Sequence, residues 1–136
     1  MITMTAAQSP VEIYKAALEE RKSDDPLQRR EACEKGFLAA VEAVDDFLVM
    51  KGYHIPKGES TAHLERADAL NELADCDATW QKIRDDFFIV QTSLHGICFY
   101  GGKNIDSPAY DHDLNVTVSE ILELTGFHFD SVGDEL

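Results

Sequence analysis

Three pairs of a short polar residue and a proline mark helix starts along the chain: Ser9-Pro10, Asp25-Pro26 and Ser107-Pro108. A Ser or Asp side chain accepts a hydrogen bond from one of the free N–H groups at a helix start, and proline in the first turn loses no backbone hydrogen bond. We therefore predict helices that begin at residues 10, 26 and 108. Asp77 is predicted to cap a further helix in the same way.

Five stretches of the sequence carry apolar residues every three or four positions, which is the spacing of one helix face. These stretches are residues 10–22, 26–51, 61–73, 77–100 and 108–125. Glycines at 52, 101–102 and 126 end the second, fourth and fifth. No stretch shows the alternation of a strand. Short connections favour antiparallel neighbours, so we predict an all-α fold, an up-and-down bundle of four main helices plus one short helix.

The expected domain organisation is simple because the chain has the length of one domain. Residues 1–9 are predicted to form an N-terminal extension, residues 10–126 the helical domain and residues 127–136 an acidic C-terminal tail. The first helix is expected to turn Val11, Tyr14 and Leu18 inward, and the short helix Leu64, Ala67, Leu70 and Leu73. The residues predicted to share one core are Phe37, Val41, Val44, Leu48, Ile83, Phe87, Val90, Leu94, Val118 and Ile121.

Charge is the strongest compositional signal, because the formal net charge is -14 and residues 61–136 hold 15 acidic but only four basic residues. Such a surface repels phosphate backbones, so we expect no general nucleic-acid binding. The basic residues that concentrate in one region are Lys15, Arg21, Lys22, Arg29 and Arg30. No stretch approaches the ~20 apolar residues of a membrane span, and Met1–Ala7 does not resemble a secretory signal. A cytoplasmic protein without membrane contact is expected.

The cysteines and polar motifs give no sign of a cofactor or metal. Cys33, Cys76 and Cys98 are odd in number and widely spaced, which favours three unpaired core residues in a reducing compartment. The stretch Asp111-His112-Asp113, with His128 nearby, places adjacent side chains in different directions on a helix, so it is a poor metal site. No phosphate-binding glycine loop, GxSxG or HExxH motif is present.

The helix predicted over residues 77–100 carries more apolar surface than one small bundle needs. Besides its regular face, it has apolar residues around the rest of the cylinder: Trp80, Phe88, Ile89, Cys98, Phe99 and Tyr100. Such a helix is either central to its own fold or covered by a partner. We favour a homodimer through this helix, with Trp80, Phe88 or Tyr100 crossing between chains, because symmetric pairing is the commonest way to cover such a patch.

Two segments resemble the HEPN superfamily of helical bundles. Residues 31–41, EACEKGFLAAV, look like its A-E-K-x-x-x-A-A helix, and residues 94–102, LHGICFYGG, are similar to the L-H-x-x-F-Y-x-G signature of the PaREP-type branch and its bacterial relatives. The order of helices over residues 10–125, with His63-Leu64 leading the short helix, also fits. The resemblance implies a bundle that is commonly dimeric. It suggests a non-catalytic module that binds a partner protein or a nucleotide.

Ribonuclease members of this superfamily share an Arg followed after four to six residues by a His, and that pattern is absent. Ten residues separate Arg84 from His95, no His follows Arg66 within reach, and His63 precedes it. The alternative function is an RNA- or nucleotide-processing enzyme that uses His95 for proton transfer and Arg84 for anion stabilisation at a dimer groove. In that case His95 of one chain approaches Arg84 of the other.

Two groups of residues are candidates for binding. Arg84, Gln91 and His95 share a helix face because seven and eleven residues are close to whole numbers of turns, and Tyr100 closes the same helix. A second group surrounds the proline-containing loop that follows the second helix: Tyr53, His54, Glu59, His63 and Arg66. The alternative, purely structural explanations are a hydrogen bond for His95 near a helix end and a solvated loop for the second group.

Overall fold

The computed structural model describes residues 9–56, 58–102 and 104–127. Its helices begin where the capping residues predict. Helix α1 (Pro10–Arg21) is capped by Ser9, α2 (Pro26–Met50) by Asp25, α4 (Ala78–Val90) by Asp77 and α5 (Pro108–His112) by Ser107. Each capping oxygen accepts a backbone N–H of the first turn, and at Ser9 the side chain of Glu12 completes a capping box. The predicted starts are therefore confirmed.

The remaining elements complete an all-helical chain, and no strand occurs in the described ranges. Helix α3 (Ala62–Ala74) is the predicted short helix. Helix α4 continues directly into the π-helix η2 (Gln91–Gly101), and α5 continues through the π-helix η3 (Asp113–Thr117) into α6 (Val118–Leu124). Uninterrupted α-helices were the expectation for both long segments. A π-helix bonds residue i to i+5, so it brings residues five apart onto one face.

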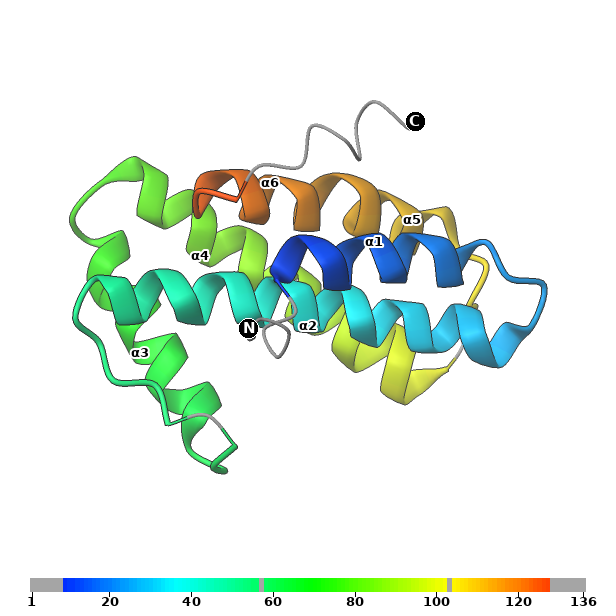
Figure 1. The fold of residues 1–136 in the computed structure, drawn as a ribbon, viewed down its shortest axis with the longest axis horizontal. Helices are drawn as coiled ribbons and strands as arrows, with labels where there is room; N and C mark the ends of the chain where they lie inside the picture. Colours follow the sequence, from blue (N-terminus) through cyan, green and yellow to red (C-terminus); the bar gives the residue numbers. More distant parts are fainter. Residues whose placement is uncertain (1–8, 57, 103, 128–136) are drawn as a thin grey trace, which may run out of the picture.

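The helices form the predicted up-and-down bundle. In Figure 1, α1, α2, the continuous α4–η2 rod and the α5–η3–α6 rod lie side by side, and α3 extends away from one end. Glycines with positive φ terminate three of the rods, at Gly52 after α2, Gly102 after η2 and Gly126 after α6, as predicted. Within the described residues, no helix combines the length and apolarity that crossing a membrane requires.

The core contains eight of the ten predicted residues in buried form, while Phe37 and Val41 are half-buried and pack against it. Two predicted stripes are shifted. In α1, Ile13, Tyr14 and Ala17 are buried, whereas Val11 and Leu18 lie at the margin. In α3, the buried face consists of Ala62, Arg66, Ala69, Leu70 and Ala74, so Leu64 lies off that face and is 56% exposed. The tail residues 128–136 and residues 1–8 of the expected extension lie outside the described part of the chain.

The prediction of three unpaired core cysteines is wrong. Cys33 of α2 and Cys98 of η2 form a buried disulfide with a Cα–Cα distance of 6.3 Å, and Cys76 is exposed. Wide spacing in sequence does not prevent pairing when two helices pack side by side. The cytoplasmic location expected from the sequence stays a prediction, and this disulfide weighs against it, because disulfides are uncommon in reducing compartments.

Candidate functional site

The most elaborate cluster of polar and aromatic side chains surrounds His95 of η2. Its Nδ1 lies 2.7 Å from Oε1 of Glu34 on α2. Its ring lies tilted against Phe37 with 4.6 Å between centroids, and it makes an edge-to-face contact with Tyr100 at 4.9 Å. Tyr100 is five residues after His95, so the π-helix brings these two rings together. We call Glu34, Phe37, Leu38, His95 and Tyr100 the α2–η2 surface.

The Glu34 contact also orients the imidazole. A carboxylate accepts hydrogen bonds, so Nδ1 of His95 donates to Glu34, and Nε2 lies on the other side of the ring. Among the described residues, Nε2 has no hydrogen-bond partner. The purely structural role considered for His95 in the sequence analysis, a hydrogen bond near a helix end, matches the Nδ1 contact. The other ring nitrogen stays available to a bound molecule.

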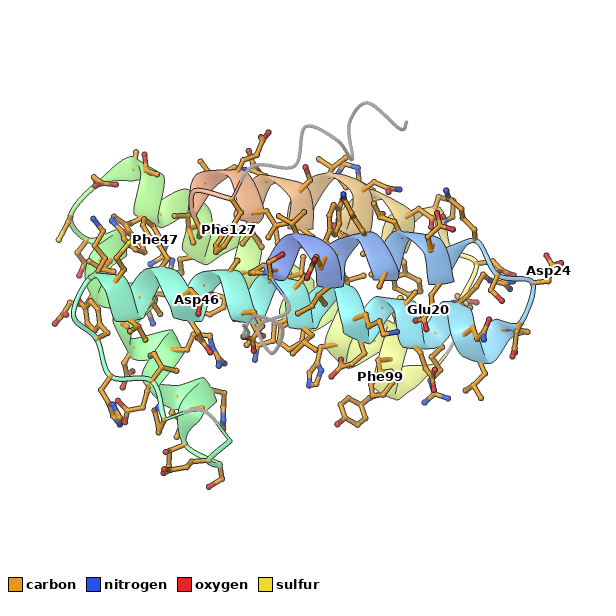
Figure 2. All side chains as sticks on the ribbon, in the orientation of Figure 1. Glu20, Asp24, Asp46, Phe47, Phe99 and Phe127 are labelled. Atoms are coloured by element: carbon orange, nitrogen blue, oxygen red, sulfur yellow. A yellow bond between two sulfur atoms is a disulfide. The ribbon has the colours of Figure 1, made fainter. Side chains whose placement is uncertain are left out.

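The two helices that carry this surface are fastened together at several points. The Cys33–Cys98 disulfide lies beneath it, one residue from Glu34. Arg30 of α2 donates to the carbonyl oxygens of Phe99 and Tyr100, and its guanidinium lies over the Phe99 ring. Figure 2 labels Phe99 on η2, below the amino-terminal half of α2. The α2–η2 surface is therefore held on rigid elements.

Arg84 lies on the same flank of the α4–η2 rod as His95 but serves another contact. Its guanidinium bonds Asp85 at 3.1 Å and Asn71 of α3 at 3.4 Å, whereas His95 contacts α2. Gln91 lies between them and is half-buried. Within one chain, Arg84 and His95 thus belong to opposite ends of one face. Their approach across a dimer stays a prediction.

The loop group separates into two environments. Tyr53 and His54 line a cavity of about 240 Å³ together with Glu65, Asp68, Ala69 and Glu72 of α3. The Tyr53 hydroxyl donates to Glu72, and this hydrogen bond raises the pKa of Tyr53. His63 and Glu59 are exposed outside this lining.

Arg66 of the loop group is not a surface residue. Its Nε and Nη2 donate to the two carboxylate oxygens of Asp45 on α2 at 2.6 and 2.8 Å. The side chains are 9% and 1% exposed, and the guanidinium lies over the ring of Phe87. Arg66 therefore joins α3 to α2 instead of facing a ligand.

One polar cluster gave no signal in the sequence. Lys82 of α4 lies 3.3 Å from both Asp86 and Glu120 of α6, and Oδ2 of Asp86 is buried without a hydrogen-bond partner. Burial, followed by the nearby Glu120 carboxyl, raises the pKa of Asp86 to about 7, although Lys82 opposes the shift. The sequence shows these three charged residues on two separate helices, but it does not reveal which carboxyl group is buried.

The basic residues near the amino terminus do not form a free patch. Arg21 bonds Asp111 and the carbonyl of Ile105, and Arg29 bonds Asp106 and the carbonyl of Ser23. Lys22 pairs with Glu19. These guanidinium groups fasten the loop before α5 to the α1–α2 hairpin. Their charges are engaged within the chain, and the absence of general nucleic-acid binding stays a prediction.

The apolar excess of the α4–η2 rod is distributed differently from the expectation. Trp80 is buried and stacks on Phe47 at 4.8 Å, and Phe88 is half-buried. The large apolar side chains that this rod leaves exposed are Ile89, Ile97 and Tyr100. Trp80 is thus covered by its own chain, so it is a poor candidate to cross a dimer interface.

Metal binding finds no support in the described residues, where no group of three or more ligating side chains converges. His128 lies outside the described residues. No family model matches the sequence, and neither does any curated protein or solved structure. The resemblance to HEPN bundles therefore stays a prediction that rests on the two short segments.

Proposed function

We propose that the protein is a non-catalytic, HEPN-like helical module that forms a homodimer and binds a partner protein through its α2–η2 surface. This proposal is supported mainly by exposed apolar side chains that lie on two helices held together by cross-links. Tyr100 is 66% and Leu38 43% exposed, on two helices joined by a disulfide and by the Glu34–His95 contact. Rigid tyrosine-containing patches suit protein interfaces, because little side-chain freedom is lost on binding.

A partner protein is favoured over a nucleotide by the state of the neighbouring arginines. Phosphate groups are bound chiefly by Arg and Lys. Arg30 already donates to two backbone carbonyls and Arg84 to Asp85 and Asn71. Nucleotide binding at the α2–η2 surface would therefore have to break existing contacts, whereas an apolar and polar protein surface would not.

The homodimer is proposed on the opposite flank of the same rod. Ser93 bonds Asp113 of η3, and Lys82 contacts Glu120 of α6, which sets the register of the two rods. Ile89 and Val116 both fall between these contacts and are exposed, and Ile97 continues the stripe. A second copy covering this stripe leaves the α2–η2 surface open for the partner.

The dimer is tested by sedimentation equilibrium of the full chain at micromolar concentration. Wild type should sediment as a dimer, and Ile97→Glu should shift it to monomer because a buried unpaired charge opposes association. Leu64→Glu is the matched control, since it charges an equally exposed apolar residue on α3. A monomeric wild type, or equal effects of both variants, would remove the dimer from the proposal.

Partner binding is tested by selecting binders from an unbiased library of displayed peptides against the full chain. If the α2–η2 surface is the binding site, most selected peptides should lose binding to Tyr100→Ser and keep it to Leu64→Ser. Both variants remove an exposed apolar side chain, so folding is preserved in each. Peptides that converge on another surface, or that ignore Tyr100, would contradict the proposed site.

A further inference from the structure

The outward face of α2 continues the α2–η2 surface toward the amino terminus of that helix. Leu27, Glu31, Glu34 and Leu38 follow one another at spacings of four, three and four residues, which places them on one helix face. We call these four residues the α2 stripe. Leu27 is 58% exposed, and Leu38 lies three turns, or about 16 Å, further along. Two apolar contacts are thus separated by two carboxylates.

The rest of α2 explains why this stripe is left open. The opposite side is lined by small buried residues that let the neighbouring helices approach closely: Ala32, Cys33, Gly36, Ala39, Ala40 and Ala43. A Cβ at Gly36 would lie only 2.4 Å from the Leu114 side chain. Among the described residues, the bundle packs mainly against that side, and η2 lies along the edge of the stripe through the contact of Glu34 with His95.

The charge of the stripe is not neutralised by its neighbours. Arg30 turns to the carbonyls of Phe99 and Tyr100, and Lys35 pairs with Glu20 of α1. Glu31 is exposed and has no ion pair among the described residues. Glu34 carries a contact only to His95. An occupant of the stripe therefore meets two leucines and two carboxylates, of which Glu31 has no ion pair among the described residues.

We propose that the occupant is a basic amphipathic helix of the partner protein. The inference rests on the proposed function and specifies the partner of that site. Apolar side chains three turns apart on the partner would contact Leu27 and Leu38, and Lys or Arg between them would face Glu31 and Glu34. A second copy of this chain fits poorly, because it would bring Glu31 against like charge in a molecule of net charge -14.

The experiment is a calorimetric titration of the full chain with two synthetic helical peptides. One has Leu at every third or fourth position and Lys elsewhere, and the other replaces each Lys by Glu. The Lys peptide should bind, with an affinity that falls as salt is raised, because exposed charges are screened. The Glu peptide should not bind. Equal binding of both peptides, or no binding of the Lys peptide, overturns the inference.

Matched variants decide whether binding uses the stripe. Glu31→Lys and Leu38→Ser should each lower the affinity for the Lys peptide by at least about tenfold, which is a loss of ~1.4 kcal/mol of binding free energy. Glu65→Lys and Leu64→Ser make the same changes on exposed positions of α3 and should leave the affinity within about twofold. Similar losses for both sets would indicate diffuse attraction to an acidic protein and overturn the inference.

Failure of this inference can be told apart from failure of the proposed function. If displayed peptides selected at the α2–η2 surface depend on Tyr100 but are neutral or acidic, the proposed function stands and the basic helix is wrong. If the Glu31 and Leu38 variants lose affinity for the Lys peptide while the selected peptides still bind the Tyr100 variant, the α2 stripe alone is the binding site. Circular dichroism of each variant verifies that its helical content is unchanged.

Discussion

The buried Arg66–Asp45 pair gives the sharpest test of how α3 is attached to the bundle. Both oxygens of Asp45 accept from one guanidinium, and both side chains are almost completely removed from water. Replacing Asp45 with Ala leaves the Arg66 charge buried without a partner, which costs about 3–5 kcal/mol of unfolding free energy. Arg66→Met likewise leaves the Asp45 carboxylate buried without a partner, and it should lower the unfolding free energy by a similar amount.

The double variant Asp45→Leu/Arg66→Met separates the charge effect from packing. Removing both charges together and filling the volume with apolar atoms should return the unfolding free energy to within about 1 kcal/mol of wild type. The assay is urea denaturation followed by far-UV circular dichroism, with the coupling energy taken from the double-mutant cycle. Single variants that cost less than ~1 kcal/mol would mean that the pair is hydrated and that α3 is not held as described.

Three further predictions concern stability. Gly36→Ala should destabilise by about 1–3 kcal/mol in urea denaturation, because its Cβ would meet the Leu114 side chain, whereas Gly96→Ala, with no such contact, should be neutral or stabilising; equal effects would contradict the close packing. Cys33→Ser should lower the unfolding free energy by up to ~4 kcal/mol through loss of a cross-link between residues 65 apart, while Cys76→Ser should match wild type in the same oxidising buffer. The pKa of Asp86 is raised from 3.8 to about 7 in the folded protein. The folded state therefore holds this proton more tightly than the unfolded state, and the resulting contribution to the unfolding free energy is fully present below about pH 4. That contribution is lost as the pH rises to about 7. Asp86→Asn should therefore be more stable than wild type at pH 8, by about 1–3 kcal/mol, and the opposite shift of Glu120 should make the measured pH slope smaller. An unchanged stability difference between pH 4 and pH 8 would rule out the raised pKa.

The helical framework could be predicted because its signals are local. Ser9, Asp25 and Ser107 cap helices through bonds to residues two or three positions away, and the adjacent prolines fix the same boundaries. The core residues of α2, α4 and α6 follow from apolar spacing. The π-helical turns of η2 could not be predicted, because Leu94 and Cys98 are four residues apart and fit an α-helix equally well.

The candidate site depended on contacts between distant segments, and these lack a local signal. His95 could be named as a candidate, but its partner Glu34 is 61 residues away. The same holds for Cys33 and Cys98, which pair only because α2 and η2 pack together. Arg66 was expected in a binding group around the proline-containing loop because it lies near that loop in the sequence. Its inward position depends on Asp45, whose burial no pattern in the sequence reveals.

The proposed binding site for a protein segment is the α2–η2 surface extended by the α2 stripe. Two-dimensional ¹H–¹⁵N NMR of the full chain, titrated with the Lys peptide, locates the binding site because each backbone amide reports its own surroundings. We expect the largest shifts at Leu27, Glu31, Leu38 and Tyr100, with small shifts over α3. Shifts centred on Glu65, Asp68 and Glu72, or spread evenly over the acidic surface, would contradict it.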